Sequence, residues 1–145
     1  HLRNRRQRQM CIRDRFEPGS PMAAQVIALA EAVDYLEACL EKHDNFLNEY
    51  SLEKMKSIDG ISIYGNASER TPIISFNIEG VHSLDLAHFL DYEGINIRSG
   101  HHCCQPLMQA LDITACARAS FYFYNNTEEV DFLVDKINKA IQVIK

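Results

Sequence analysis

Two thiols and two imidazoles are consecutive in the stretch Arg98-Ser-Gly-His-His-Cys103-Cys-Gln-Pro-Leu-Met108. A glycine near its start and a proline in its second half predict a loop, and reactive groups that a rigid scaffold presents on loops often carry function. The alternative is structural, because free cysteine is among the most buried residue types. The neighbouring arginine and histidines favour a reactive thiol, since such groups stabilise a thiolate. The candidates are therefore Cys103 and Cys104, with Arg98, His101 and His102 around them.

These residue types suit zinc, redox or nucleophilic chemistry. Structural zinc sites separate paired ligands by two to four residues, whereas the four ligands here are consecutive, and adjacent side chains in an extended loop diverge. Cys11 and Cys116 could complete a metal site, but nothing in the sequence fixes them nearby, so we expect no bound metal. A neighbouring cysteine pair also differs from the C-x-x-C spacing of thioredoxin-like sites. Nucleophilic catalysis by Cys103 fits the pattern best.

Arg118 is a further candidate, because it lies within an apolar and aromatic stretch. A guanidinium there costs desolvation energy unless a carboxylate pairs with it. No acidic residue stands beside it in the sequence. Its partner is therefore either a distant side chain, in a structural ion pair, or a ligand carboxylate bound through two hydrogen bonds.

Composition indicates one globular domain: the chain has 145 residues, of which 46% are hydrophobic. No apolar run approaches the roughly 18 residues of a membrane span, and the start of the chain does not resemble a secretory signal. The five cysteines are an odd number without the spacing of a disulfide framework. This usage predicts free thiols in a reducing, cytoplasmic setting.

Charge is distributed unevenly along the chain. Residues 1–15 hold six arginines and one aspartate, whereas residues 16–145 hold nine basic and nineteen acidic residues. An acidic body gives no support for nucleic-acid binding. The basic head could be an RNA- or membrane-binding arm, but it lacks interleaved aromatic residues and periodicity. We therefore expect residues 1–15 to be a foreign lead-in without function, and residues 16–145 to be the domain.

The pattern of apolar residues predicts an α+β fold in the order ααββαββα, a small and mostly antiparallel sheet covered by helices. Ser83 and Gly94 are predicted to cap one helix, and Asn126 with Glu129 has the form of a capping box. The predicted helices cover residues 22–40, 44–57, 83–92 and 126–145, the strands cover 61–64, 74–78, 95–98 and 117–124, and a helical turn covers 107–111.

The loop at residues 98–108 closely resembles the active-site loop of Suf-type (group II) cysteine desulfurases, written R-x-G-H-H-C-A-x-P-L-M. Three more segments resemble that family and occur in its order: they match its F-E-x-G-T-P, its I-S-F-N-x-x-G-V-H, and its C-R-A-S…Y-N…E-E-V-D. In this chain these segments are Phe16-Glu-Pro-Gly-Ser-Pro21, Ile74-Ser-Phe-Asn-Ile-Glu-Gly-Val-His82, and Ala117-Arg-Ala-Ser120 with Tyr124-Asn125 and Glu128-Glu-Val-Asp131. The resemblance covers residues 16–145 and excludes the basic head.

The resemblance implies the small C-terminal domain of a fold-type I pyridoxal-phosphate enzyme of the class V aminotransferase group. Such enzymes take sulfur from L-cysteine, release L-alanine and carry a persulfide for iron–sulfur cluster assembly. Some act on selenocysteine, and these residues do not separate a desulfurase from a selenocysteine lyase. The parent protein is expected to be a homodimer.

The family's residue roles carry over by position. Cys103 becomes the thiol that attacks the substrate sulfur and carries the persulfide, and Arg118 the residue that holds the substrate carboxylate. Arg98 lies near the same pocket and is expected to help position the substrate or the persulfide, and His101 and His102 support the loop. Ser20 is a separate candidate for cofactor binding, because it replaces a family threonine in a segment that approaches the cofactor phosphate of the other subunit.

Three departures from the family pattern affect these expectations. Cys104 replaces the usual alanine, so a second thiol could compete for the persulfide or relay it. Leu84 replaces a histidine found in many members, which favours a SufE-like sulfur acceptor. No lysine follows a histidine, so the cofactor lysine and the large domain are expected to be missing and the chain to be inactive alone. The alternatives are a stand-alone persulfide-carrying thiol domain without pyridoxal phosphate and a small metal-binding structural domain.

Overall fold

The computed structural model of the protein describes residues 22–40, 44–65, 67 and 70–145. The chain divides into two compact units, residues 1–39 and 40–145. Helix α3 (Ala23–Leu40) makes up nearly all of the described part of the first unit, at the position the apolar spacing predicted. The predictions for the basic head, for residues 16–21 and for Ser20 lie outside the described residues.

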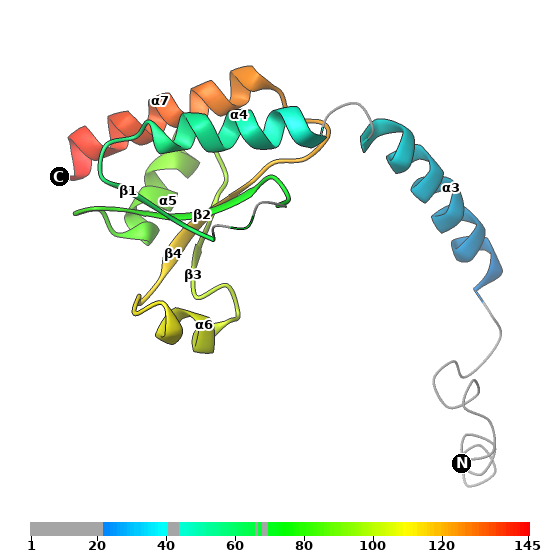
Figure 1. The fold of residues 1–145 in the computed structure, drawn as a ribbon, viewed down its shortest axis with the longest axis horizontal. Coiled ribbons are helices and arrows are strands. Elements are labelled where there is room, and N and C mark those ends of the chain that lie inside the picture. Colours follow the sequence, from blue (N-terminus) through cyan, green and yellow to red (C-terminus); the bar gives the residue numbers. More distant parts are fainter. Residues whose placement is uncertain (1–21, 41–43, 66, 68–69) are drawn as a thin grey trace, which may run out of the picture. The chain divides into compact units, whose positions relative to one another are not determined.

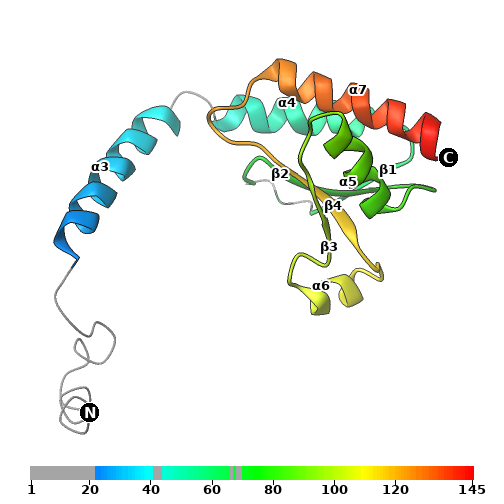
Figure 2. The ribbon, with the colours of Figure 1, turned by 180° about the vertical axis from the view of Figure 1, so that it is seen from behind.

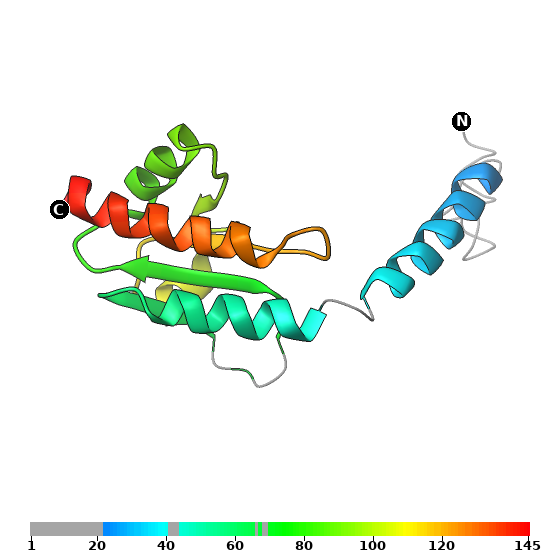
Figure 3. The same ribbon diagram turned by 90° about the horizontal axis from the view of Figure 1, so that it is seen from above.

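The second unit is a four-stranded sheet with helices on one face (Figures 1 and 2). The strand order is β1-β2-β4-β3, and every neighbouring pair is antiparallel, which confirms the predicted α+β class. Helices α4 and α7 lie side by side over the sheet, and α5 packs against α7, β3 and β4 (Figure 3). The elements are α4 (Asp44–Lys56), β1 (Ile61–Tyr64), β2 (Ile73–Ile78), α5 (Ser83–Tyr92), β3 (Arg98–Gly100), α6 (Gln105–Ala110), β4 (Cys116–Ser120) and α7 (Thr127–Ile144).

The core follows from the two periodicities of the sequence. In β2, Ile74, Phe76 and Ile78 are buried beneath the helices, while the residues between them point to the opposite face, as strand geometry requires. Helix α7 contributes one stripe of buried residues at helical spacing to the same core. That stripe consists of Val130, Leu133, Ile137 and Ala140.

The predicted helix caps are partly confirmed. The Asn126 side chain accepts a hydrogen bond from the Glu129 amide at 2.9 Å, and the Glu129 carboxylate accepts one from the Asn126 amide at 3.2 Å, which completes the capping box of α7. Gly94, with a φ of +84°, follows the end of α5 as expected. The prediction that Ser83 caps α5 is wrong. The cap is His82, whose Nδ1 accepts a hydrogen bond from the Leu84 amide at 3.2 Å.

Two strands and the short helix have bounds that differ from the predicted ones. Strand β3 begins only at Arg98, so the prediction for residues 95–98 is displaced toward the N-terminus. Strand β4 ends at Ser120, because the aromatic residues after it form a turn in which the Asn125 side chain accepts a hydrogen bond from the Tyr122 amide at 2.8 Å. Helix α6 begins two residues before the predicted turn, since Pro106 is tolerated in a first helical turn.

Candidate functional site

The outer face of the sheet, opposite the helices, carries a row of polar side chains. Strand register pairs Tyr64 with Ser75, Ser75 with Arg118, and Arg118 with Arg98. Directly paired residues point to the same side of a sheet, so these four side chains cross all four strands on one face. Ala117, the strand neighbour of Arg118, is fully buried on the other face. The register therefore brings two of the predicted site residues together at the edge formed by β3 and β4.

The loop that follows β3 has an unusual backbone. Gly100 has a φ of +116°, His102 of +53° and Cys103 of +58°. The left-handed region costs residues other than glycine roughly 1–3 kcal/mol each and persists only where the surrounding structure imposes it. The expectation of an extended loop is therefore wrong. The chain turns sharply before it enters α6. In this turn, the Cys104 amide donates a hydrogen bond to the His101 carbonyl at 2.9 Å.

The Cys103 thiol is exposed and touches a cation. Arg98 Nη2 donates a hydrogen bond to Cys103 Sγ at 3.4 Å. A cationic donor beside a sulfur favours negative charge on that sulfur, which is the form that attacks electrophiles. The structure thus brings together the predicted nucleophile and one of its predicted supports, and it leaves the thiol open to a reactant.

His102 anchors the loop to the sheet. Its Nε2 lies 3.0 Å from the carbonyl oxygen of Cys116 in β4. Burial lowers the pKa of His102, positive charge on Arg118 and Arg98 lowers it further, and the hydrogen bond to Cys116 opposes the shift. The ring is therefore neutral at pH 7. Because a carbonyl oxygen only accepts, Nε2 carries the hydrogen, and Nδ1 presents a lone pair that has no hydrogen-bond partner within the described residues.

His101 contributes through its backbone. Its carbonyl accepts the Cys104 amide, while its side chain is exposed. The prediction that the two histidines support the loop thus corresponds to two different contacts: a ring hydrogen bond for His102 and a backbone hydrogen bond for His101.

Arg118 is half-buried and unpaired in the part of the chain that the structure describes. Its Nε is buried without a hydrogen-bond partner, and no ion pair among the described residues involves it or Arg98. Like charges directly opposite each other on neighbouring strands repel. The two guanidiniums therefore favour an anion between or beside them, which agrees with the alternative that Arg118 binds a ligand carboxylate.

The remaining described cysteines differ from this pair. Cys116 is buried, and burial raises the pKa of its thiol. Cys39 lies on α3, in the other unit. Across the described residues, no group of three or more histidine, cysteine or acidic side chains is arranged to hold a metal ion.

An open hollow surrounds the Cys103 thiol. None of the residues that line it is a lysine, and Lys54, Lys136 and Lys139 are ion-paired on the helical side of the sheet. This hollow alone therefore does not fit a cofactor bound covalently through lysine. Its lining is Arg98, Ser99, His101, His102, Cys103, Cys104, Gln105 and Pro106.

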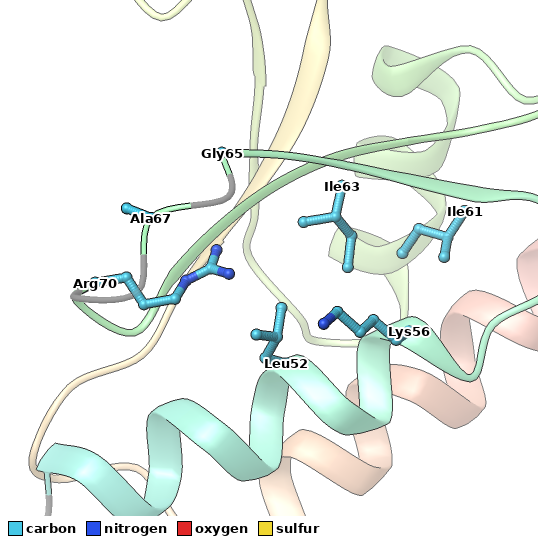
Figure 4. Close-up of a pocket in the computed structure, with 7 residues that line it drawn as sticks. All are labelled: Leu52, Lys56, Ile61, Ile63, Gly65, Ala67 and Arg70. Carbon is cyan, nitrogen blue, oxygen red and sulfur yellow. The ribbon is translucent and has the colours of Figure 1, made fainter.

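A second hollow lies between α4 and β1 (Figure 4). The side chains of Leu52, Lys56 and Ile63 approach it from the helix and the strand, and Arg70 reaches it from the loop before β2. None of the predicted site residues lines this hollow. It is therefore separate from the Cys103 loop.

Asn77 is a supporting residue to which the sequence analysis gave no role. From the outer face of β2, its Nδ2 donates to the Ala115 carbonyl at 2.8 Å and to the Tyr64 hydroxyl at 3.2 Å. Ala115 directly precedes Cys116, the residue that anchors His102. The sequence feature that could have identified Asn77 is its position on the polar side of an alternating strand, with a side-chain amide that can donate two hydrogen bonds.

Comparison with known proteins agrees with these features. The family described as aminotransferase class-V matches residues 5–133. A probable cysteine desulfurase of Halalkalibacterium halodurans is 45% identical over 130 residues, which cover 87% of this chain and 32% of the relative. A probable cysteine desulfurase of Staphylococcus epidermidis is 45% identical over 131 residues, with the same coverage.

Solved structures give the same result. The apo cysteine desulfurase of Thermococcus onnurineus superposes with a TM-score of 0.78 at 32% identity, over 90% of this chain and 34% of that one. The cysteine desulfurase CsdA of Escherichia coli, in an S-sulfonic acid form, superposes with a TM-score of 0.74 at 28% identity, over 89% of this chain and 33% of that one. The chain spans about a third of the length of these proteins. It belongs to the class V aminotransferase family.

Proposed function

We propose that this chain is the thiol-bearing part of a pyridoxal-phosphate-dependent cysteine desulfurase, with Cys103 as the thiol that accepts sulfur from L-cysteine. The observation that carries the proposal is the exposed Cys103 thiol, held 3.4 Å from the Arg98 guanidinium, with Arg118 nearby and without an ion-pair partner among the described residues. The names of the relatives at 45% identity support the same activity.

The proposed roles follow from charge and position. Arg118 binds the substrate carboxylate, because a guanidinium offers two parallel donors to it. Arg98 stabilises negative charge on Cys103, whose sulfur attacks the substrate sulfur. A sulfur–sulfur bond forms as the substrate carbon–sulfur bond breaks. The electron pair of the broken bond stays with the substrate carbon, which takes up a proton to give L-alanine, and the transferred sulfur remains on Cys103 as a persulfide. His102 and the His101 carbonyl hold the loop during this exchange.

The cofactor is proposed to be bound mainly by the part of the enzyme to which this chain does not correspond, since the hollow offers no lysine. Pyridoxal phosphate, when bound, supplies the electron sink that weakens the substrate carbon–sulfur bond. Ser20 is proposed to contact the cofactor phosphate across a homodimer. We further propose a cytoplasmic enzyme that passes sulfur to a SufE-like acceptor for iron–sulfur cluster assembly.

A chimaera tests the proposal. Residues 16–145 replace the matching part of the Halalkalibacterium halodurans relative, and L-alanine release from L-cysteine is measured. We expect release that Cys103→Ser reduces by about 100-fold or more, and that Cys39→Ser, in the other unit, leaves unchanged within about twofold. Arg118→Lys raises KM for L-cysteine, because an ammonium cannot reproduce the two-donor contact.

Two outcomes would overturn the proposal. One is a chimaera that binds the cofactor yet releases no L-alanine. The other is L-alanine release that persists in Cys103→Ser. If the unmodified chain accepts sulfur at Cys103 from an inorganic donor while the cofactor-bound chimaera stays inactive, the chain is a stand-alone thiol carrier instead.

A further inference from the structure

Cys104 is a second exposed thiol whose backbone is fixed and whose side chain is free. Its amide donates to the His101 carbonyl, and its carbonyl accepts from the amides of Leu107 and Met108 at 3.2 and 3.3 Å. Cys104 caps α6, but its side chain makes no capping hydrogen bond. The position of its Cβ is therefore set by the loop and the helix, while the sulfur can rotate among the staggered positions about one bond.

The surroundings of the two neighbouring thiols differ. Cys103 Sγ receives a hydrogen bond from Arg98, whereas Cys104 Sγ receives none from the described residues. The Arg98 guanidinium is therefore placed to stabilise negative charge that develops on Cys103 Sγ as a bond to it breaks, and no such donor stands beside Cys104 Sγ among the described residues. In an exchange between the two sulfurs, the sulfur that better tolerates negative charge is the better leaving group.

We propose that Cys104 is a second sulfur-carrying residue, which takes the terminal sulfur of a Cys103 persulfide and presents it to the acceptor. The idea rests on the proposed function of Cys103. The Cys104 thiolate attacks the outer sulfur of the persulfide, so that a bond forms between Cys104 Sγ and that sulfur while its bond to Cys103 Sγ breaks. The electron pair of the broken bond stays on Cys103, next to Arg98. The hydrogen stays on the transferred sulfur, and no oxidant or reductant is consumed.

Chain geometry favours this transfer over a disulfide between the two cysteines. Consecutive Cα atoms are about 3.8 Å apart, less than the roughly 4.4–6.8 Å that unstrained disulfides span. Transfer instead needs the two Sγ atoms on either side of the moving sulfur, about two sulfur–sulfur bond lengths or roughly 4 Å apart. The left-handed φ of Cys103 turns the loop, so the two side chains are not held in the alternating directions of an extended chain.

A pulse–chase experiment on the whole chain tests the relay. The protein receives a short pulse of inorganic polysulfide, the donor is removed, and samples are alkylated at intervals. Mass spectrometry of the peptides then locates the extra sulfur on individual cysteines. We expect sulfur on Cys103 to move to Cys104 during the chase while their sum stays constant, at a rate that does not depend on protein concentration. Buried Cys116 should remain unlabelled, and any sulfur on Cys39 should stay there.

Arg98→Ala adds a readout that a purely structural role would not change. Without the guanidinium, Cys103 becomes a poorer leaving group, and the final ratio of sulfur on Cys104 to sulfur on Cys103 should fall by about threefold to fivefold. Cys103→Ser should show no change in Cys104 labelling during the chase, because the donor residue is absent.

The outcomes separate the relay from the function on which it rests. Sulfur that loads on Cys103 and stays there throughout the chase overturns the relay alone. The same holds if Cys104 gains sulfur only at a rate proportional to protein concentration. A chain in which Cys103 takes up no sulfur overturns both the relay and the proposed role of Cys103.

Discussion

Cys103 and Arg98 are five residues apart in sequence, and the turned loop brings sulfur and guanidinium into contact. The residue types of this site were predictable from the sequence, because thiols, imidazoles and arginines are concentrated in one short stretch. Their geometry was not predictable. It depends on a left-handed backbone at His102 and Cys103, and no glycine marks either position.

Removing the Arg98 guanidinium should slow the reaction of Cys103 with iodoacetamide. An exposed charge contact contributes up to about 1 kcal/mol, so Arg98→Ala should lower the alkylation rate at neutral pH by about threefold to fivefold. Arg98→Lys should retain part of the effect. Peptide mass spectrometry resolves Cys103 from Cys104, whose rate is the internal control. An unchanged Cys103 rate would show that the contact does not influence the thiol.

Protonation of His102 should destabilise the fold at acidic pH. Burial holds the pKa of His102 in the folded chain below the ordinary 6.5 of the unfolded chain. At a pH between the lowered pKa and 6.5, the unfolded chain therefore binds the proton and the folded chain does not. The stabilisation is complete above pH 6.5 and is lost as the pH falls through the lowered pKa. The variant His102→Gln keeps a donor for the Cys116 carbonyl but cannot take up the proton. Thermal unfolding is measured at about pH 7 and about pH 5, and the variant should lose less stability on acidification than the wild type. Equal losses in both proteins would assign the effect to other groups.

At the scale of elements, Asn77 connects β2 to β1 through the Tyr64 hydroxyl and to Ala115, the residue before the His102 anchor. Asn77→Ala leaves the partly buried Ala115 carbonyl without its donor, which should lower the free energy of unfolding by about 1–3 kcal/mol. The matched control is Ser62→Ala at the register partner, an exposed position where a change within about 0.5 kcal/mol is expected. Urea unfolding measures both. Equal effects at the two positions would remove the supporting role of Asn77.

The errors in predicting elements have local causes. The alternation of aromatic residues after Ser120 has the period of a strand, yet the rings of Tyr122, Phe123 and Tyr124 pack edge-on against one another in a turn. Sequence periodicity cannot separate these two arrangements. The capping box at Asn126 was predictable, because its contacts are made within three residues. The cap at His82 was missed, because histidine is not among the preferred capping residues.

At the scale of the whole molecule, the unit of residues 40–145 has helices α4, α5 and α7 on one face of its sheet and the cationic site on the other. Ile137 of α7 is fully buried, whereas Val143 of the same helix is 66% exposed. Ile137→Ala should therefore cost about 2–5 kcal/mol of unfolding free energy, and Val143→Ala about 0.5 kcal/mol or less. Chemical denaturation gives both values. A small effect at Ile137 would mean that α7 does not close the core.

The family was predictable because four motif-like segments occur in the right order, and the match over residues 5–133 agrees. The α+β class was predictable because the helical and strand periodicities are distinct. The chain spans about a third of the length of its relatives, so only the part of the family pattern that falls within this third was open to prediction.

The most direct test follows a heavy sulfur isotope from L-cysteine into the chimaera described above. After a short incubation and alkylation, mass spectrometry locates the labelled sulfur. With Cys104→Ser in place to prevent further movement, the label should appear as one added sulfur on Cys103, and Cys103→Ser should remove it. Label that is absent from Cys103, or that reaches another thiol equally well in Cys103→Ser, would contradict the assignment of Cys103 as the sulfur-accepting residue.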